Sequence, residues 1–144
     1  MKKGFTLIEL LVVIAIIAML SSLSVIALNS ARAKSRDARR LSDIKQIKTA
    51  LEMFYDQNLQ YPAAPVGTTT LGVDSASACL TANGWTTTGG CVGTIFMQRV
   101  PKDPQPSTRA YLYARGGTLN NTFTITYFSE ADNGTKTATE SSMN

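Results

Sequence analysis

The sequence predicts an α+β fold in which one long N-terminal helix packs on a small antiparallel sheet of about three strands. Residues 5–28 are almost wholly apolar, and neither proline nor glycine occurs from Phe5 to Gln60. In the last third of the chain the hydrophobic period changes from helical to alternating. With 144 residues, the chain is long enough for one modest domain and too short for two full hydrophobic cores.

The composition argues against several kinds of catalytic and metal site. Histidine is absent, which removes Ser-His-Asp and Cys-His nucleophile arrangements and nearly all zinc sites that use imidazole. The two cysteines cannot complete a tetrahedral metal site by themselves. We therefore expect no metal and no cofactor. The formal net charge of +4 belongs to residues 1–56, because residues 57–144 carry five basic and five acidic side chains.

The apolar stretch at residues 5–28 is long enough to span a membrane. Its interruptions are few and small: Thr6, Glu9, Ser21, Ser22 and Ser24. As a helix that rises 1.5 Å per residue, it reaches about 36 Å, which exceeds a hydrocarbon core of about 30 Å. The stretch therefore predicts a transmembrane helix.

Two ordinary interpretations of this stretch leave features unexplained. A cleaved secretory signal, with the lysine pair at positions 2–3 as its positive end and Val25 and Ala27 as a cleavage pair, has a suitable length. It would, however, lack a polar region before the cut and would carry a carboxylate. A plain single-span anchor does not explain Glu9, because a charged side chain inside a bilayer costs about 3 kcal/mol or more.

A third interpretation rests on the motif KGFTLIELLVVIAI at residues 3–16. A glycine, an aromatic residue and a glutamate at this spacing, followed by an uncharged apolar run, resemble the N-terminal motif of the type IV pilin and pseudopilin family. The resemblance implies that residues 1–4 are a leader, that a prepilin peptidase cuts after Gly4, and that the new amine of Phe5 is N-methylated. It also implies that Thr6 and Glu9 act in assembly. The protein would then be a substrate of the peptidase and not an enzyme.

Charge alone leaves the orientation of the span open. The lysines at positions 2–3 favour a cytoplasmic N-terminus under the positive-inside rule, but five basic residues follow the span between Arg32 and Arg40. The resemblance implies a single-pass protein of the bacterial inner membrane with a cytoplasmic N-terminus and an exported head. That protein would later enter an extracytoplasmic filament.

Residues 29–60 are expected to continue the helix as an amphipathic half. Apolar residues recur there at every third or fourth position: Ala38, Leu41, Ile44, Ile47, Leu51, Phe54 and Tyr55. Together with the span they predict a helix of about 54 residues, roughly 80 Å long. The apolar face of the second half must be buried, and the candidate partner in the chain is the C-terminal sheet. The result is a pilin-like lollipop with its head at residues 61–144.

A basic run between Arg32 and Lys48 holds seven basic residues with Asp37 and Asp43 among them. Binding to nucleic acid or anionic lipid is one interpretation of such a run. No aromatic residue lies within it to stack on bases. We therefore favour a solvated helix face and expect no nucleic-acid partner.

Residues 62–93 are predicted to form a long irregular connection. They contain six of the ten glycines, many threonines and a single charge, Asp74. Because the resemblance implies an exported head, Cys79 and Cys91 are expected to form a disulfide that stabilises this loop by about 3 kcal/mol. Free thiols and an intermolecular bridge remain alternatives. Trp85 lies inside the closed loop, either as its small core or as an exposed contact, and we favour the core.

Residues 94–144 are predicted to form the sheet. Tyr111 and Tyr113 alternate with smaller residues, and the apolar members of the segment 123–127 alternate with threonines. Gly116-Gly117 and Asn120-Asn121 supply a turn between the two strands. Asn133-Gly134 marks a second hairpin, which leads into a weak strand near residues 135–140.

Four stretches of the chain resemble the major pseudopilin of type II secretion: residues 42–51, 61–62, 100–104 and 111–113. Two departures from that pattern stand out. The family often has a proline in the span, where this chain has Ser24-Val25-Ile26-Ala27. Major pseudopilins also bind calcium in an aspartate-rich loop, but Glu130, Asp132 and Asn133 offer too few oxygen ligands, so no calcium is predicted.

The predicted function is that of a structural subunit of a type IV filament that serves type II protein secretion. Its expected partners are identical subunits, the prepilin peptidase and methylase, an inner-membrane platform with its assembly ATPase, and the lipid membrane before assembly. A type IV pilus for adhesion, twitching motility or DNA uptake is the first alternative. A membrane-anchored protein that binds a ligand through its head is the second.

Overall fold

A computed structural model describes residues 4–64, 67–73 and 76–141 of the chain. Residues 1–3 of the expected leader, Asp74 of the expected connection and the last three residues lie outside the described ranges. The chain divides into two compact units, residues 1–35 and residues 36–144. Helix α1 (Leu7–Asn58) contributes its first part to the first unit and its second part to the second unit.

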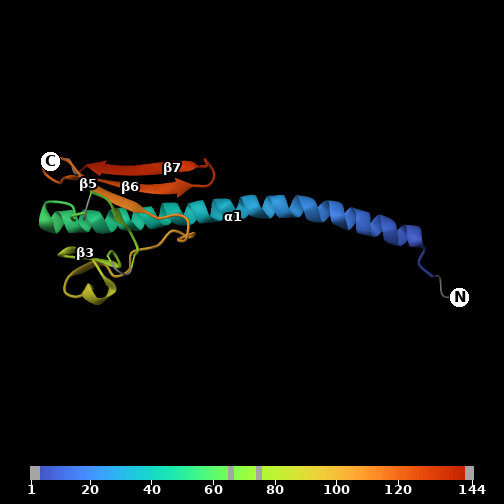
Figure 1. The fold of residues 1–144 in the computed structure, drawn as a ribbon, viewed down its shortest axis with the longest axis horizontal. Coiled ribbons are helices and arrows are strands. Elements are labelled where there is room, and N and C mark those ends of the chain that lie inside the picture. Colours follow the sequence, from blue (N-terminus) through green and yellow to red (C-terminus); the bar gives the residue numbers. More distant parts are fainter. Residues whose placement is uncertain (1–3, 65–66, 74–75, 142–144) are drawn as a thin grey trace. The chain divides into compact units, whose positions relative to one another are not determined.

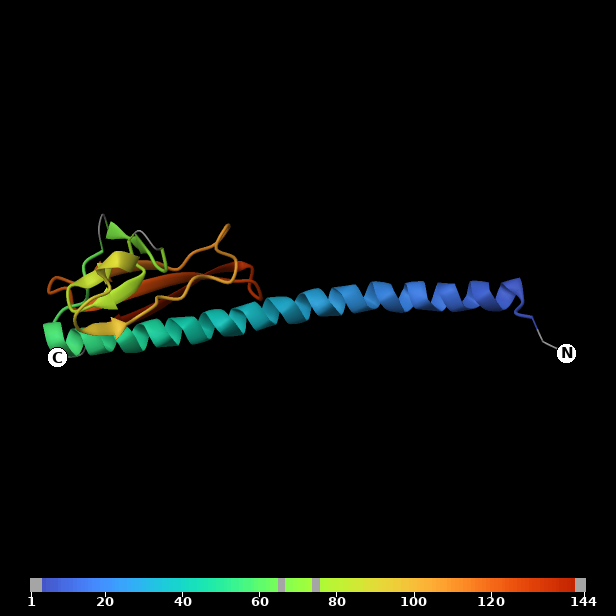
Figure 2. The same ribbon diagram turned by 90° about the horizontal axis from the view of Figure 1, so that it is seen from below.

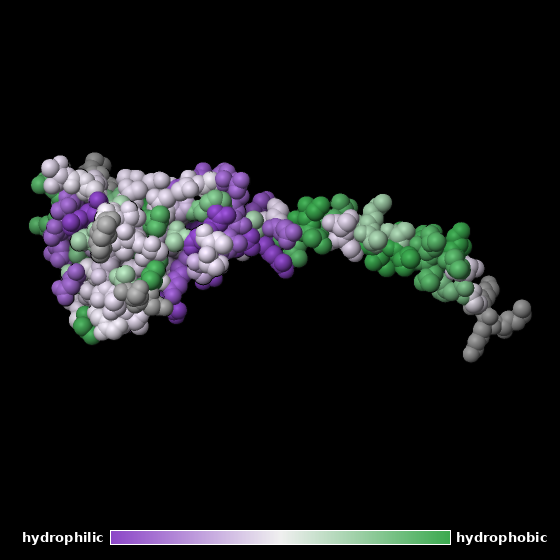
Figure 3. All heavy atoms as spheres, viewed as in Figure 1, coloured by the Kyte–Doolittle hydropathy of each residue, from purple (hydrophilic) through white to green (hydrophobic). Residues whose placement is uncertain are grey.

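The first unit consists of the apolar part of α1. The helix has an 18-residue window with a mean hydropathy of 2.8, and none of that window is buried. Figure 3 shows this part of α1 covered by hydrophobic side chains. By length and composition the segment can cross a membrane. The serines at positions 22 and 24 donate their hydroxyls to the carbonyls of Met19 and Leu20, and α1 stays helical through them.

The second unit packs two antiparallel sheets on the second part of α1 (Figures 1 and 2). One sheet has the order β1-β5-β6-β7, and the other has the order β3-β2-β4. The bounds of the elements are β1 Thr69–Thr70, β2 Cys79–Thr81, β3 Gly84–Thr86, the 3-10 helix η2 Thr88–Gly90, β4 Ile95–Met97, β5 Leu112–Gly116, β6 Thr122–Ser129 and β7 Gly134–Ser141. The α+β prediction, a long helix packed on antiparallel sheets, is confirmed.

The C-terminal hairpins lie where the sequence places them. In the turn between β5 and β6, Gly117 and Asn120 adopt positive φ angles of 78° and 56°, which glycine and asparagine tolerate best. Asn133 does the same with φ 47° before β7, and Ser129 pairs with Gly134 in register. The turn residues therefore set the register of both hairpins.

The connection at residues 62–93 is more ordered than predicted. It holds β1, β2, β3 and η2. β1 joins the edge of the first sheet, and β2 and β3 form the second sheet together with β4, which follows the connection. These strands are two or three residues long, which is too short for an alternating pattern to be detected. Cys79 and Cys91 are joined in a disulfide, as predicted. The ring of Trp85 packs edge-on against Tyr113 at 5.2 Å between centroids. Trp85 is therefore partly buried against the main core and does not form a separate small core of the loop.

The core lies between α1 and the sheets. Its residues on α1 are Ile44, Ile47, Ala50, Leu51 and Phe54, and its residues outside α1 are Tyr61, Leu71, Leu80, Val100, Tyr111, Tyr113, Phe123 and Ile125. The predicted stripe is wrong at its start, because Ala38 is exposed and Leu41 is 48% exposed. At that level of α1 the inward positions are taken by Arg40 and Asp43, both buried. Hydrogen bonds to the rest of the unit, described below, make this burial of polar groups tolerable.

Candidate functional site

The predicted processing and assembly residues lie at the start of α1 and form a capping box. Thr6 precedes the first helical residue, Leu7, and its backbone N–H donates to Glu9 Oε2 at 2.9 Å. The Thr6 hydroxyl donates to the same oxygen at 2.6 Å, and the Glu9 N–H donates back to Thr6 Oγ1 at 3.3 Å. Reciprocal bonding of this kind satisfies N–H groups that the first turn of a helix leaves without partners.

The sequence interpretation assigned Glu9 to contacts between subunits and missed this local role. The signal was present, because a threonine followed three residues later by glutamate before an apolar run is the signature of a capping box. The two local bonds to the Glu9 carboxylate both end on Oε2. The carboxylate is therefore held at the start of the helix with Oε1 still able to accept a second donor.

Gly4 and Phe5 precede the helix in a segment without regular structure. A Cβ atom added at Gly4 would meet nothing within 4 Å, so packing within the described residues does not require a glycine there. Phe5 is 83% exposed. The bond between these two residues is thus open to another protein, and a glycine lets that protein approach the backbone closely.

A second constellation, absent from the sequence interpretation, centres on the buried guanidinium of Arg40. Its Nε and Nη2 donate to the two carboxylate oxygens of Asp103 at 2.8 and 3.0 Å. Nη1 donates to Asp37 at 2.8 Å and to Glu130 at 2.7 Å, and Nη2 also reaches the Gln105 side chain at 3.3 Å. Arg40 is fully buried, so the carboxylates around it stabilise a charge that would otherwise be very costly.

Arg40 and its carboxylate partners form an ion cluster, which Arg36 and Asp37 extend to the turn before β7. Arg36 forms a bidentate pair with Glu130, at 2.8 and 2.6 Å. Asp37 accepts hydrogen bonds from the backbone N–H groups of Glu130 and Ala131, at 3.1 and 2.8 Å. One turn of α1 thereby fixes the end of β6 and the start of the following turn.

The ion pairs shift the acidities of the carboxyl groups. The hydrogen bonds from Arg36, helped by those from Arg40, outweigh burial and lower the pKa of Glu130 to about 2. Burial raises the pKa of Asp37, but the hydrogen bonds from the backbone of Glu130 and Ala131 and from Arg40 outweigh it, so its pKa lies below the ordinary value. Both groups are therefore charged over the physiological range.

Asp43, the next buried polar residue of α1 after Arg40, is hydrogen-bonded to the residue that precedes β5. Tyr111, which is fully buried, donates its hydroxyl to Asp43 Oδ2 at 2.9 Å. Burial raises the pKa of Asp43, although the Tyr111 hydrogen bond opposes that shift. Burial and the Asp43 carboxylate raise the pKa of Tyr111.

The prediction of a solvated basic face is therefore wrong for part of the run. Arg36 and Arg40 pair with carboxylates of loops and turns, whereas Arg32, Lys34 and Arg39 are exposed. The partners of Arg40 lie 63 and 90 residues away in sequence, and periodicity cannot reveal such partners. The available signal was the spacing of charged residues at positions 36, 37, 40 and 43, which share one helix face.

The acidic residues considered for calcium have other partners. Glu130 is bound by two arginines, and Asp132 pairs with Lys136 at 3.0 Å and accepts the hydroxyl of Ser129. Within the described ranges, no group of three or more His, Cys, Asp or Glu side chains could hold a metal ion. The carboxylates near the turn before β7 are thus engaged with cations of the chain itself.

Two family models match the chain, one at each end. Residues 1–25 match the prokaryotic N-terminal methylation motif. Residues 26–143 match protein G of the type II secretion system. The chain belongs to the type II secretion protein G family. No curated protein and no solved structure matches it.

Membership of the protein G family confirms the resemblance to type IV pilins and pseudopilins that the N-terminal motif indicated. The family consists of structural pseudopilins of a secretion system and is not an enzyme family. The methylation motif and the apolar start of α1 fit a membrane-anchored, single-pass protein. This protein G-family chain accordingly combines an N-terminal methylation motif with an apolar helical segment that is not buried in the described structure.

Proposed function

We propose that this chain is processed after Gly4, N-methylated at Phe5, and polymerised through the first part of α1 into a pseudopilus that serves type II secretion. The observation that carries the proposal is that the apolar window of α1 is wholly unburied within the chain. Such a surface requires either a bilayer or other helices around it. The protein first occupies the inner membrane as a single span, with its N-terminus in the cytoplasm and its head exported, and then exchanges lipid for neighbouring subunits.

Glu9 sets the register in which neighbouring subunits pack in the filament. Cleavage after Gly4 creates a cationic amine on Phe5, next to the threonine that caps the helix. The Glu9 carboxylate, held at the start of α1 through Oε2, then pairs through Oε1 with the amine of a neighbouring subunit. Two unit charges 4 Å apart attract by about 4 kcal/mol at an effective dielectric constant of 20, a gross value from which desolvation is subtracted. A subunit shifted along its neighbour leaves both charges unpaired in an apolar setting.

Three features of the chain support this proposal. The methylation motif supports the cut after Gly4, and the family match supports secretion over adhesion or motility. The Cys79–Cys91 disulfide supports export of the head, because disulfides persist in oxidising compartments. The peptidase, the inner-membrane platform and the assembly ATPase are the partners that the proposal requires.

Intact-mass measurement tests the processing step. Protein from cells that contain the peptidase should lack residues 1–4 and carry one added methyl group, and protein from cells without the peptidase should keep all residues. A mature N-terminus near Leu28 would contradict the proposal and support a secretory signal.

Removal of the gene from its native host tests the function in secretion. Proteins normally released by the secretion system should accumulate behind the outer membrane, and the intact gene should restore their release. Normal release together with lost surface motility, adhesion or DNA uptake would contradict the secretion role and favour a pilus.

A further inference from the structure

The surface around residues 100–106 in the second unit is basic and grooved. Three adjoining grooves of about 500, 360 and 550 Å³ lie on it, and Lys102 lines all three. Arg99 lines two of them, Arg109 lines another, and Arg39 reaches the largest groove from α1. We call this surface, with its four cationic side chains, the basic face.

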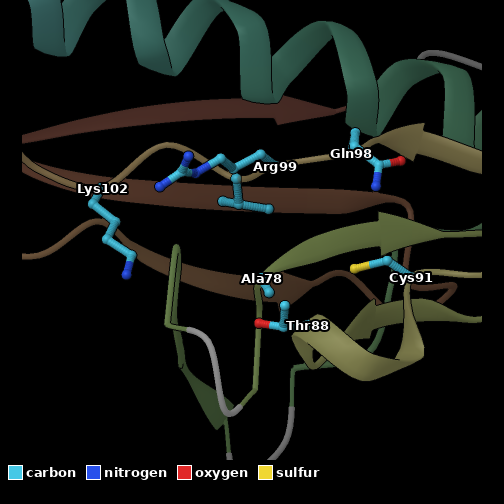
Figure 4. Close-up of a pocket in the computed structure, with 7 residues that line it drawn as sticks. Ala78, Thr88, Cys91, Gln98, Arg99 and Lys102 are labelled. Atoms are coloured by element: carbon cyan, nitrogen blue, oxygen red, sulfur yellow. The ribbon is translucent and has the colours of Figure 1, made fainter.

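Figure 4 shows the groove beside the disulfide. Gln98 and Arg99 lie along one wall, Cys91 and Thr88 lie across from them, and Lys102 lies at one end. The side chains of Gln98 and Arg99 in this groove can donate hydrogen bonds through amide and guanidinium groups. The groove thus offers donors and positive charge to a ligand that brings acceptors and negative charge.

Arg109 is the best-oriented cation of the basic face. Its guanidinium carbon lies 3.0 Å from the centroid of the Phe128 ring, a stacked arrangement that holds the planar group in place. Its Nε is buried and has no hydrogen-bond partner in the described part of the chain. A guanidinium held in one orientation by stacking is suited to a carboxylate, which would accept hydrogen bonds from the terminal Nη groups and not from the buried Nε.

Within the described residues, Arg99 and Arg109 of the basic face are not paired with the acid that stands closest to the grooves in sequence. Asp103 lines two of the grooves, but its carboxylate is buried and bound by Arg40. Two other carboxylates of the unit, Glu130 and Asp132, pair with Arg36 and Lys136. These carboxylates are therefore engaged with other cations of the unit. The guanidinium of Arg99 stays exposed on the surface.

We propose that the basic face binds an extended acidic segment of another protein, with carboxylates of that segment on Arg109 and Arg99. The grooves adjoin one another, so a strand can lay successive side chains into them. Pro101, Pro104 and Pro106 line the largest groove, and proline restricts the backbone there. Nucleic acid fits less well, because the described lining residues of these grooves offer no aromatic ring on which a base could stack.

The proposal is tested on the full chain in micelles of a zwitterionic detergent. The probe is a fluorescein-labelled peptide of alternating glutamate and alanine, and its anisotropy reports binding. The matched peptide has glutamine in place of glutamate. We expect saturable binding of the glutamate peptide that weakens with salt, and little binding of the glutamine peptide.

Three single-charge variants locate the site. Arg99→Gln and Arg109→Gln should each weaken binding several-fold, up to about fivefold for an exposed pair and more at the stacked Arg109. Lys45→Gln removes the same charge from an exposed position of α1 outside the grooves and should change binding by less than twofold. Arg109→Lys keeps the charge without the planar fork and should behave like Arg109→Gln. Since Arg99 is exposed, Arg99→Gln keeps the test valid if changes at Arg109 disturb folding.

Several outcomes would overturn the proposal. Equal binding of the two peptides would show that carboxylates are not recognised. Equal weakening by Lys45→Gln and Arg99→Gln would show that only net charge matters. Displacement of the peptide by glycerol phosphate or by a single-stranded oligonucleotide at lower concentrations than by unlabelled glutamate peptide would assign the face to a lipid headgroup or a nucleic acid instead.

Discussion

Replacement of Arg40 by methionine should strongly destabilise the second unit. The guanidinium makes five hydrogen bonds, two of them to Asp103, which is 3% exposed. Methionine fills similar space but leaves that carboxylate buried without its counter-charge. Breaking a buried ion pair in this way costs about 3–5 kcal/mol, a large share of a typical unfolding free energy of about 5–15 kcal/mol.

Urea denaturation of the full chain in detergent micelles measures this loss. Trp85 is the only tryptophan, and its ring packs on Tyr113, so its fluorescence follows unfolding of the second unit. Arg39→Met, one position away and exposed, is the matched control and should change the unfolding free energy by no more than about 0.5 kcal/mol. Arg40→Met with Asp103→Leu should recover part of the loss, because both charges are removed together.

A loss below about 1 kcal/mol for Arg40→Met would refute this reasoning, as would a loss equal to that of the Arg39 control. The buried guanidinium would then contribute no more than a solvated one. A double variant less stable than Arg40→Met alone would show that Asp103 is stabilised by something other than Arg40.

Three further changes probe the second unit. Acidification should lower its unfolding free energy, because the pKa of Glu130 is about 2 in the folded chain against an ordinary value of 4.5: its contribution is complete above about pH 4.5 and is lost as the pH falls towards 2. Cys79→Ser with Cys91→Ser should cost about 3 kcal/mol in the same urea titration. Tyr111→Phe removes the hydroxyl donor of the buried Asp43 carboxylate and should cost about 1–3 kcal/mol.

Each of these three expectations has a result that contradicts it. A midpoint that stays constant from pH 5 to pH 2.5 would show that Glu130 is not held in its charged form. A cysteine-free variant as stable as the parent would mean that the disulfide does not constrain the unfolded chain. An unchanged unfolding free energy for Tyr111→Phe would mean that Asp43 does not depend on the Tyr111 hydroxyl.

Local patterns predicted the elements whose signals lie in consecutive residues. The long helix follows from an apolar run and a helical stripe, and β5, β6 and β7 follow from alternation bounded by turn residues such as Asn133. The second sheet was missed because strands such as β2 are three residues long. All three residues of β2 are buried, so the strand gives no alternation of apolar and polar residues.

The polar part of the interior could not be predicted from local patterns. Arg40 looked like one more residue of a basic run, and only its contact with Asp103, 63 residues later, makes it an interior group. Ala38 and Leu41 were predicted to start the apolar stripe because their spacing is helical. The sequence does not show that Arg40 takes the inward position at that level of the helix. At the N-terminus the motif gave both Thr6 and Glu9, and the structure adds the hydrogen bonds between them.

The central claim is that Glu9 sets the register of a filament built from the first part of α1, and the Glu9→Leu variant tests it most directly. It should be compared in the native host with the parent and with Thr6→Val, which removes the capping hydroxyl but keeps the carboxylate. Membrane fractionation and intact mass should show that Glu9→Leu is still inserted and still cut after Gly4. Filaments, counted by electron microscopy of sheared material, should be absent or strongly reduced for Glu9→Leu. Normal numbers of filaments from inserted and processed Glu9→Leu subunits would contradict the claim.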